Sequence, residues 1–287
     1  MANKGKFNTE KMVAIDTHVH IEGRSEGNQA AEAARKYFGD SGLGSQQLPE
    51  YYRSRNIGCV VFSVDERLTG RPQATNDEVL AFAAENSDIM IPFVSVDPTR
   101  GPSAVDEAKR LIATGVVRGF KLHPPAQQFH ANDRIAYRLY EVVAEARLPM
   151  IFHTGHSGIG TGMPGGGGIR LKYGNPMEID DVAVDFPDMP IIMAHPSFPW
   201  QDEALSVCLH KPQVYIDLSG WSPKYFPANL VQYANTQLKK KVLFGSDYPF
   251  IPPDRWLEDF AKIAIRDEVR PLILKENAMR LLGLSGS

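Results

Sequence analysis

Five of the eight histidines in this chain stand in, or directly after, short apolar segments rich in β-branched residues. These five are His18, His20, His123, His153 and His195. Imidazole is a common ligand for divalent metals and a proton carrier near neutral pH. One histidine in such a position is most often an ordinary core or surface residue. Five at equivalent positions predict a functional site that binds a metal or performs acid–base chemistry.

His18 and His20 form the first pair, in the run Asp-Thr-His-Val-His. Alternate residues of a strand point to the same face, so the two imidazoles can chelate one divalent ion. The spacing His-x-His is a weak signal by itself. Its position in the first apolar segment, with further histidines downstream, strengthens it.

A third and a fourth imidazole come from His153, in Phe-His-Thr-Gly, and His195, in Ala-His-Pro. Asp247, in Gly-Ser-Asp-Tyr-Pro, adds a carboxylate near the end of the chain. Taken alone, Asp247 reads as a turn residue before Tyr-Pro, but beside the histidines it is the missing oxygen ligand. Three histidines and one aspartate suit a zinc-type site with room left for water.

Eight apolar segments are placed to carry these side chains. They cover Val13–His20, Ile57–Asp65, Ile89–Asp97, Val116–His123, Pro149–Thr154, Pro190–His195, Val214–Ser219 and Lys241–Asp247. Near-continuous apolar runs are typical of parallel strands that are buried on both faces. Helical patterns separate most of them, as at Ser103–Ala113, Asp133–Ala146 and Pro253–Ile265. The sequence therefore predicts an α/β fold, a (β/α)₈ TIM barrel with the metal site at the C-terminal ends of the strands.

An open, doubly wound sheet is the alternative fold. In a closed barrel, by contrast, the eighth strand lies beside the first, which would let Asp247 reach a metal held by His18 and His20. The whole chain, residues 1–287, is expected to form one domain, because it holds no linker and no internal repeat. Two segments look inserted: residues 23–49, with a helical piece at 30–37, and the glycine-rich residues 155–176.

Composition narrows the class of protein. The net charge of −3, from 31 basic and 34 acidic residues, gives no basic excess for nucleic-acid binding. No apolar run approaches the roughly 20 residues of a membrane span, and the polar N-terminus lacks the apolar part of a secretory signal. Two cysteines make no disulfide framework. We therefore expect a cytoplasmic protein that acts on a small molecule, with no nucleic-acid or membrane partner; a homodimer is left open.

The order of the four motifs resembles that of the amidohydrolase superfamily. The closer resemblance is to its amidohydrolase-related branch, which includes aminocarboxymuconate-semialdehyde decarboxylase and resorcylate decarboxylases, and it spans roughly residues 13–282. It implies a metal-dependent (β/α)₈ barrel in which His18, His20, His153 and Asp247 are the metal ligands. His195 matches a histidine that is catalytic in one-metal members and a second-metal ligand in two-metal members.

Lys121, in Gly-Phe-Lys-Leu-His-Pro, departs from the decarboxylases of that branch. It resembles the lysine of two-metal members such as dihydroorotase, where a carboxylated lysine bridges the metals. The alternative is an unmodified Lys121 that pairs with a substrate carboxylate or with Asp247. We expect one divalent ion, zinc before manganese, and treat a second ion with a carboxylated Lys121 as the alternative.

Substrate contacts are expected from residues near the strand ends. His123 shares the face of Lys121, and His156 follows the third ligand closely. Arg170 and Tyr173 follow a glycine-rich loop that lacks the spacing of phosphate-binding loops and reads better as a mobile rim. They could meet an anionic substrate, although a solvated surface position for Arg170 is an equally good interpretation.

The expected reaction is metal-dependent hydrolysis of a small ester, lactone or amide that carries a carboxylate. A metal lowers the pKa of a bound water, Asp247 would accept its proton, and His195 would hydrogen-bond the water or the oxyanion. The alternative is non-oxidative decarboxylation of an aromatic or unsaturated acid at the same site. A barrel that binds a ligand without chemistry is disfavoured, because every expected ligand position carries a suitable residue.

Overall fold

The computed structural model describes residues 7–21, 47–70 and 73–284. Most of the predicted insertion at 23–49, including its helical piece at 30–37, lies outside them. Eight strands are present in the described part of the chain. They are β1 (Ala14–His20), β2 (Ile57–Phe62), β3 (Met90–Pro92), β4 (Phe120–Leu122), β5 (Met150–His153), β6 (Ile191–Ala194), β7 (Val214–Asp217) and β8 (Val242–Leu243). Each lies within a predicted segment, and all eight are shorter than predicted.

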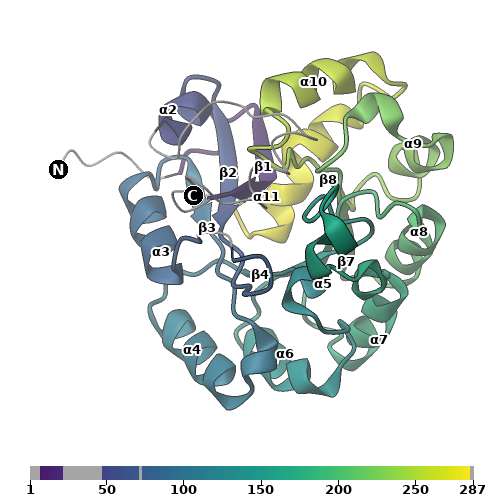
Figure 1. Ribbon diagram of the computed structural model, residues 1–287. Helices are drawn as coiled ribbons and strands as arrows, with labels where there is room; N and C mark the ends of the chain where they lie inside the picture. The colour runs from purple at the N-terminus through teal and green to yellow at the C-terminus, as the bar shows by residue number, and fades with distance from the viewer. Residues whose placement is uncertain (1–6, 22–46, 71–72, 285–287) are drawn as a thin grey trace.

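The strands close into a barrel. All pairs within the sheets β1-β2-β3 and β4-β5-β6-β7-β8 are parallel. Two isolated parallel bridges, Val94 to Phe120 and Val19 to Tyr248, join these sheets at both edges. Figure 1 shows the result along the barrel axis, with the helices in an outer ring. Closure excludes the open, doubly wound sheet and confirms the predicted barrel.

The helices that cover the barrel follow the strands in alternation. They are α2 (Leu48–Arg53), α3 (Asn76–Glu85), α4 (Pro102–Ala113), α5 (Pro124–Gln127), α6 (Arg134–Glu145), α7 (Met177–Asp185), α8 (Gln201–His210), α9 (Ala228–Asn235), α10 (Pro253–Lys262) and α11 (Asn277–Leu281). The three helical patterns named from the sequence correspond to α4, α6 and α10. Local sequence determines where several helices begin. Thr75 and Glu78 form a capping box at the start of α3, and proline occupies the first turn of α4 and of α10.

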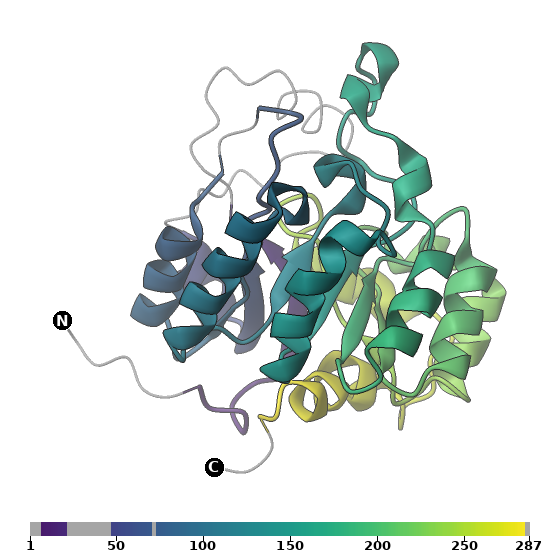
Figure 2. The same ribbon diagram turned by 90° about the horizontal axis from the view of Figure 1, so that it is seen from below.

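Alternation along the strands divides the apolar side chains into two cores. One core lies between strands and helices. The other fills the barrel and contains Ile15, Val60, Phe62, Ile91, Phe93, Ile151, Ile192, Ala194, Leu243 and Ala278. Because Ala278 belongs to α11, this helix closes the end of the barrel opposite to the strands' carboxyl ends, as Figure 2 shows in side view. The polar residues of the barrel interior therefore lie at the other end, where the strands finish.

In the described ranges, no helix combines the length and the apolar character that a membrane crossing requires.

Candidate metal centre

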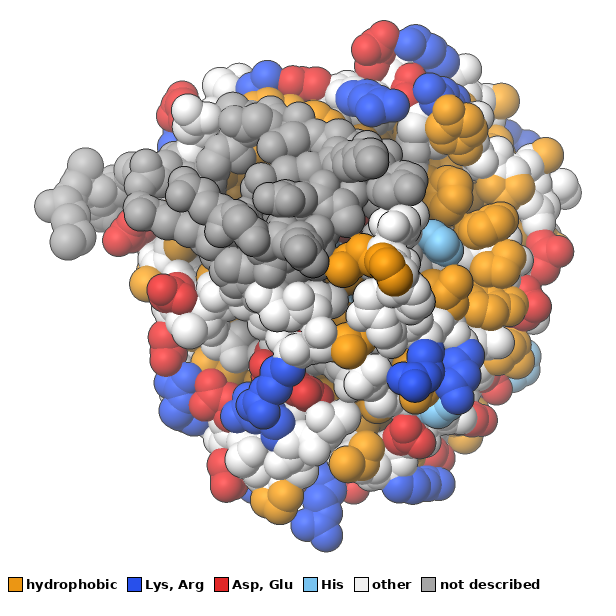
Figure 3. Space-filling model, in the orientation of Figure 1, with side chains coloured by type: hydrophobic (Ala, Val, Ile, Leu, Met, Phe, Trp, Pro, Cys, Tyr) orange, Lys and Arg blue, Asp and Glu red, His pale blue; other side chains and the backbone are white. Residues whose placement is uncertain are grey.

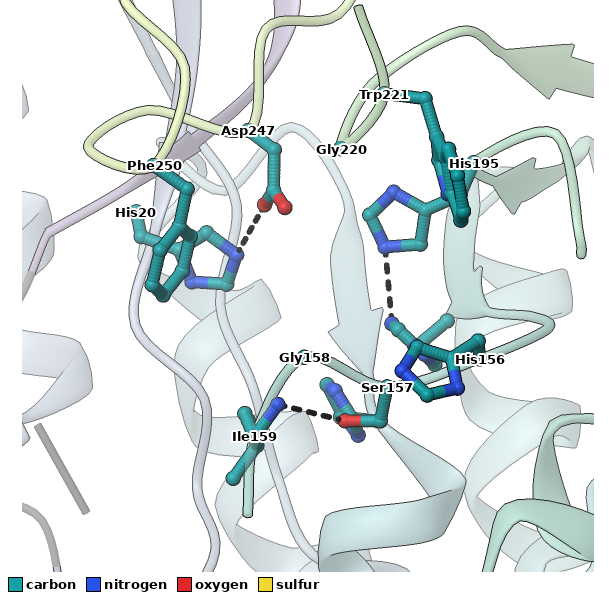
Figure 4. Close-up of a pocket in the computed structure, with 12 residues that line it drawn as sticks. His20, His156, Ser157, Gly158, Ile159, His195, Gly220, Trp221, Asp247 and Phe250 are labelled. Atoms are coloured by element: carbon teal, nitrogen blue, oxygen red, sulfur yellow. Dashed lines mark hydrogen bonds and ion pairs between the residues drawn. The ribbon is translucent and has the colours of Figure 1, made fainter. Parts of the chain in front are cut away.

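Three of the predicted ligands converge where β8 meets β1. Nε2 of His20 lies 3.1 Å from Oδ1 of Asp247, and Nε2 of His18 lies 3.3 Å from the same oxygen. The three ligand atoms lie within 4.8 Å of one another. Figure 4 shows Asp247 pointing toward His20. The carboxylate and the two imidazoles therefore present a nitrogen–nitrogen–oxygen group of the kind that holds a divalent metal.

The backbone turns Asp247 toward this group. Asp247 has a φ of 67° and its N–H donates to the carbonyl of His18 at 3.0 Å. A non-glycine residue in the left-handed region costs about 1–2 kcal/mol and persists where the surroundings enforce it. Beyond Leu243, where β8 ends, the chain stays hydrogen-bonded to β1, since the N–H of Thr17 donates to the carbonyl of Phe244 at 2.9 Å, and this pairing brings the carboxylate to β1.

Lys121 extends inward from β4 to the same place. Its Nζ lies 3.2 Å from Nε2 of His18 and 5.0 Å from the centre of the Phe62 ring. Burial lowers its pKa to about 8, against the opposing attraction of Asp217 and Asp247. The side chain is thus a buried amine with a lowered pKa, and it contacts a metal-ligand candidate directly.

His153 and His195 form a second group, on the β5–β6 side. Nε2 of His195 lies 2.9 Å from Nδ1 of His153, a contact marked by the dashed line at His195 in Figure 4. The His153 ring stacks on His123, with centroids 3.9 Å apart. Burial lowers the pKa of His195 to about 4 and that of His153 well below its usual value. Both rings are therefore neutral at physiological pH, the state in which imidazole binds a metal.

His153 was predicted as a ligand, yet it is not part of the group formed by His18, His20 and Asp247. Its Nε2 is buried and has no hydrogen-bond partner among the residues described. His195 was predicted beside the reacting water, but both of its nitrogens contact protein groups, since Nδ1 lies 3.1 Å from the carbonyl oxygen of Ser219.

Sequence reasoning missed Asp217, the last residue of β7, and Ser219, two residues beyond it. Oδ2 of Asp217 lies 3.0 Å from Nδ1 of His18, and Oγ of Ser219 lies 2.9 Å from Nδ1 of His195. Burial opposes ionisation of Asp217, but the neighbouring His18 and the hydrogen bonds it receives hold its pKa well below the usual value. The run Ile-Asp-Leu-Ser-Gly carried a signal: two polar residues alternate at the end of an apolar strand.

This donor set fits a divalent metal. Nδ1 of His18 donates to Asp217, so Nε2 of that ring carries a lone pair. This Nε2 nevertheless lies 3.3 Å from a carboxylate oxygen of Asp247, which is also an acceptor. Two acceptors so close require a cation or a shared proton donor, and Lys121 is the donor present. The orphaned Nε2 of buried His153 is a further unsatisfied acceptor or donor nearby.

A pocket opens over these groups at the ends of the strands. Its described lining consists of His20, His123, His153, His156, Ser157, Gly158, Ile159, His195, Gly220, Trp221, Asp247 and Phe250. His123 and His156 are therefore among the residues that line this pocket. On this face, hydrophobic side chains gather on the side of α8 and α9 (Figure 3).

Arg170 and Tyr173 are not brought to the described pocket wall. Arg170 is exposed beside the short helix η3 (Leu171–Gly174). Tyr173 packs edge-on against the ring of His130, which in turn binds Glu178 at 2.5 Å. Among the described lining residues there is no lysine or arginine. Neither side chain is therefore among the described residues that line the pocket, which the linear sequence does not reveal.

Known structures share this fold. An uncharacterised TIM-barrel protein from Bordetella bronchiseptica is 23% identical with a TM-score of 0.78, over 96% of this chain and 99% of that one. A probable 2-pyrone-4,6-dicarboxylic acid hydrolase from Acinetobacter baumannii is 18% identical with a TM-score of 0.61, over 95% and 100%. A dihydroxybenzoic acid decarboxylase from a Polaromonas species, with bound manganese and 2-nitroresorcinol, is 14% identical with a TM-score of 0.63, over 96% and 98%.

No curated protein sequence matches this chain. The family model described as amidohydrolase does match it, over residues 15–284, which include every predicted metal ligand. With its closed barrel and its histidine–aspartate group at the strand ends, the chain belongs to the amidohydrolase family and is an enzyme of that family.

Proposed function

We propose that this enzyme is a metal-dependent hydrolase of a small carboxylate-bearing ester, lactone or amide. The observation that carries the proposal is the convergence of His18, His20 and Asp247, whose ligand atoms lie within 4.8 Å of one another, with His20 and Asp247 lining the pocket. His18 and His20 would hold the metal through their Nε2 atoms, Asp247 through a carboxylate oxygen, and His153 through its orphaned Nε2. Zinc suits these ligands best, and manganese also binds such sites.

A divalent ion held there would make water a nucleophile near neutral pH and would polarise a carbonyl group. Asp247 is the group placed to take the proton from the attacking water, because its carboxylate lies at the pocket wall and is 15% exposed. It can return that proton to the leaving group. The carboxylate acts here as acceptor and carrier, a role that an amide of the same shape cannot fill.

His123 is the chain's own donor for a substrate oxygen. Its Nδ1 accepts the backbone N–H of Ala126 at 3.2 Å, so the neutral ring carries its proton on Nε2. The ring lines the pocket and stacks on His153. An N–H fixed in this way is suited to a carbonyl oxygen that gains charge during the reaction, or to a substrate carboxylate.

The test begins with the metal content of protein purified without chelator. We expect about one ion per chain, together with zinc- or manganese-dependent hydrolysis in a screen of lactones, esters and amides that carry a carboxylate. About two ions per chain would favour a carboxylated Lys121 that bridges them. Full activity after complete removal of divalent metals would overturn the proposal.

Non-oxidative decarboxylation is the second candidate. Trp221 and Phe250 lie on opposite sides of the pocket in Figure 4, an arrangement suited to a flat, unsaturated ring. The same purified protein, incubated with hydroxylated aromatic acids, would then release carbon dioxide without consuming water. Carbon dioxide release with no activity on any ester, lactone or amide would replace the first candidate by this one.

A further inference from the structure

We infer that Asp217 and Ser219, at the end of β7, are positioning residues that set the tautomers of three active-site histidines. The inference concerns His18 and His195 directly, and His153 through His195. It deepens the proposed function, since it accounts for the lone pairs that a metal requires at this site. The two residues lie at the strand's end, where they are buried with 0% exposure.

Both carboxylate oxygens of Asp217 already have hydrogen-bond donors. Its Oδ1 accepts the backbone N–H of His195 at 3.2 Å, the N–H of Ser219 at 3.0 Å, and the hydroxyl of Ser219. Its Oδ2 lies 3.0 Å from Nδ1 of His18. A carboxylate can only accept, so Nδ1 of His18 carries the proton, and Nε2 of the same ring carries the lone pair.

Ser219 fixes the second ring. Its hydroxyl hydrogen goes to Asp217, so toward His195 this oxygen can only accept. Nδ1 of His195 lies 2.9 Å from that oxygen and 3.1 Å from the carbonyl oxygen of Ser219. With two acceptors facing it, Nδ1 of His195 is protonated, and Nε2 is the acceptor nitrogen.

The third tautomer follows from the second. Nε2 of His195 lies 2.9 Å from Nδ1 of His153, which must therefore donate. The lone pair of His153 then sits on Nε2, the buried atom that has no partner in the described part of the protein. The β7 pair thus turns lone pairs of His18 and His153 toward the interior of the site.

A metal bound among His18, His195 and Asp217 would be the other interpretation of this cluster, because their ligand atoms also lie within 4.8 Å. The hydrogen bonds argue against it. Oδ1 of Asp217 already accepts three donors, and the hydroxyl of Ser219 lies 3.1 Å from Nδ1 of His18, in the space that an ion would need. The geometry is that of a carboxylate orienting a ligand ring from behind.

The substitution Asp217→Asn makes the inference testable, because its outcome is dictated by the same hydrogen bonds. The three donors around Oδ1 require the amide oxygen at that position, which places the amide NH₂ opposite Nδ1 of His18. A donor now faces this nitrogen, so the ring must move its proton to Nε2. The lone pair toward Asp247 is lost, while the shape of the side chain is kept.

The experiment records long-range ¹H–¹⁵N spectra of the histidine rings in the full-length, metal-free protein, with rings assigned by single substitutions. In the unchanged protein we expect the Nδ1–H tautomer at His18, His195 and His153. In Asp217→Asn we expect His18 to change to the Nε2–H tautomer. Zinc affinity, measured by competition with a chromophoric chelator, should fall about 10–100-fold.

Asp16→Asn is the matched control. Asp16 is another fully buried acidic side chain, but its donors in the described part of the chain are the backbone N–H of His18 at 3.1 Å, the hydroxyl of Tyr52 at 2.8 Å and two groups of Ser246, and none of them is a histidine ring nitrogen. It should leave the His18 tautomer unchanged. An equal tautomer change in both variants would mean a general response to losing a buried carboxylate and would overturn the inference.

The spectra of the unchanged protein decide the matter even if Asp217→Asn fails to fold. An Nε2–H tautomer at His18 or at His195 in that protein would overturn the inference. Because the spectra need neither metal nor substrate, they remain valid if the proposed hydrolase activity is absent. Conversely, a wrong tautomer would leave the hydrolase proposal standing.

Discussion

The two sides of the pocket differ in charge and in what their side chains contact. On the β8–β1 side, Asp247 brings a carboxylate to within 3.3 Å of two imidazoles. On the β5–β6 side, His195 and His153 are neutral rings that contact each other. Figure 4 shows His20 and Phe250 facing His195 and Trp221 across the pocket.

This difference indicates that the two sides of the pocket have different roles. The charged side supplies the anionic ligand and the proton acceptor, and the neutral side supplies a hydrogen-bonded row of rings that ends in an unsatisfied nitrogen. The backbone is strained on both sides of the pocket, since Asp247 and His195 have left-handed φ values of 67° and 72°. Strain at these two residues is consistent with side chains held in place for chemistry.

The largest expected effect comes from the charged side. Asp247→Asn keeps the size of the side chain but removes its charge and its capacity to accept a proton. We expect kcat to fall about 10²–10⁴-fold, with the thermal unfolding midpoint nearly unchanged, because the residue lies at the pocket surface. Steady-state kinetics on the best substrate measure it. Activity within twofold of the unchanged enzyme would remove Asp247 from the mechanism.

A substitution on the neutral side should have a smaller effect, and it should first lower the affinity for the metal. His153→Gln removes the buried Nε2 that has no partner. We expect zinc affinity to fall about tenfold or more, since imidazole is a stronger zinc ligand than an amide. A chelator competition measures the loss. Unchanged affinity with reduced kcat would move His153 from metal binding to substrate contact.

Gly220→Ala disturbs both sides at once. A Cβ at Gly220 would lie 2.6 Å from Nδ1 of His195 and 3.2 Å from Oδ2 of Asp247. Gly115→Ala is the matched control, because Gly115 has a φ of 71°, close to the 72° of Gly220, and open space around its Cβ position. Both should lose about 1–2 kcal/mol of stability from the left-handed backbone, but only Gly220→Ala should lose most of its activity. Equal activity in the two variants would contradict the close packing at Gly220.

The smallest effect is expected from a substitution that lies outside both sides of the pocket. Arg170 is exposed and does not line the described pocket. Arg170→Ala should change kcat/KM less than about twofold, as is usual for an exposed side chain away from the site. Kinetics with an anionic and a neutral substrate of equal size test it. A tenfold loss confined to the anionic substrate would restore the contact that the sequence suggested.

Strand positions could be read from the sequence, whereas the points at which strands end could not. The predicted eighth strand, Lys241–Asp247, shortens to Val242–Leu243, and the seventh ends at Asp217 instead of Ser219. In both cases a residue beyond the assigned strand faces the site: Asp247 lines the pocket, and Ser219 contacts His195. Apolar patterns reveal burial but not the hydrogen bonds that end a strand, so this difference needs the folded neighbours.

The sequence by itself determined the eight strands, the alternation that sets His18 and His20 on one face, and the histidines and aspartate at the strand ends. These depend on local periodicity, which each segment carries alone. Only the tertiary structure decided that His18 meets Asp217, 199 residues away, that His195 binds His153, and that Arg170 stays outside. Such pairings depend on closure of the barrel, which brings β1, β6 and β7 together and selects hydrogen-bond partners that no single segment specifies.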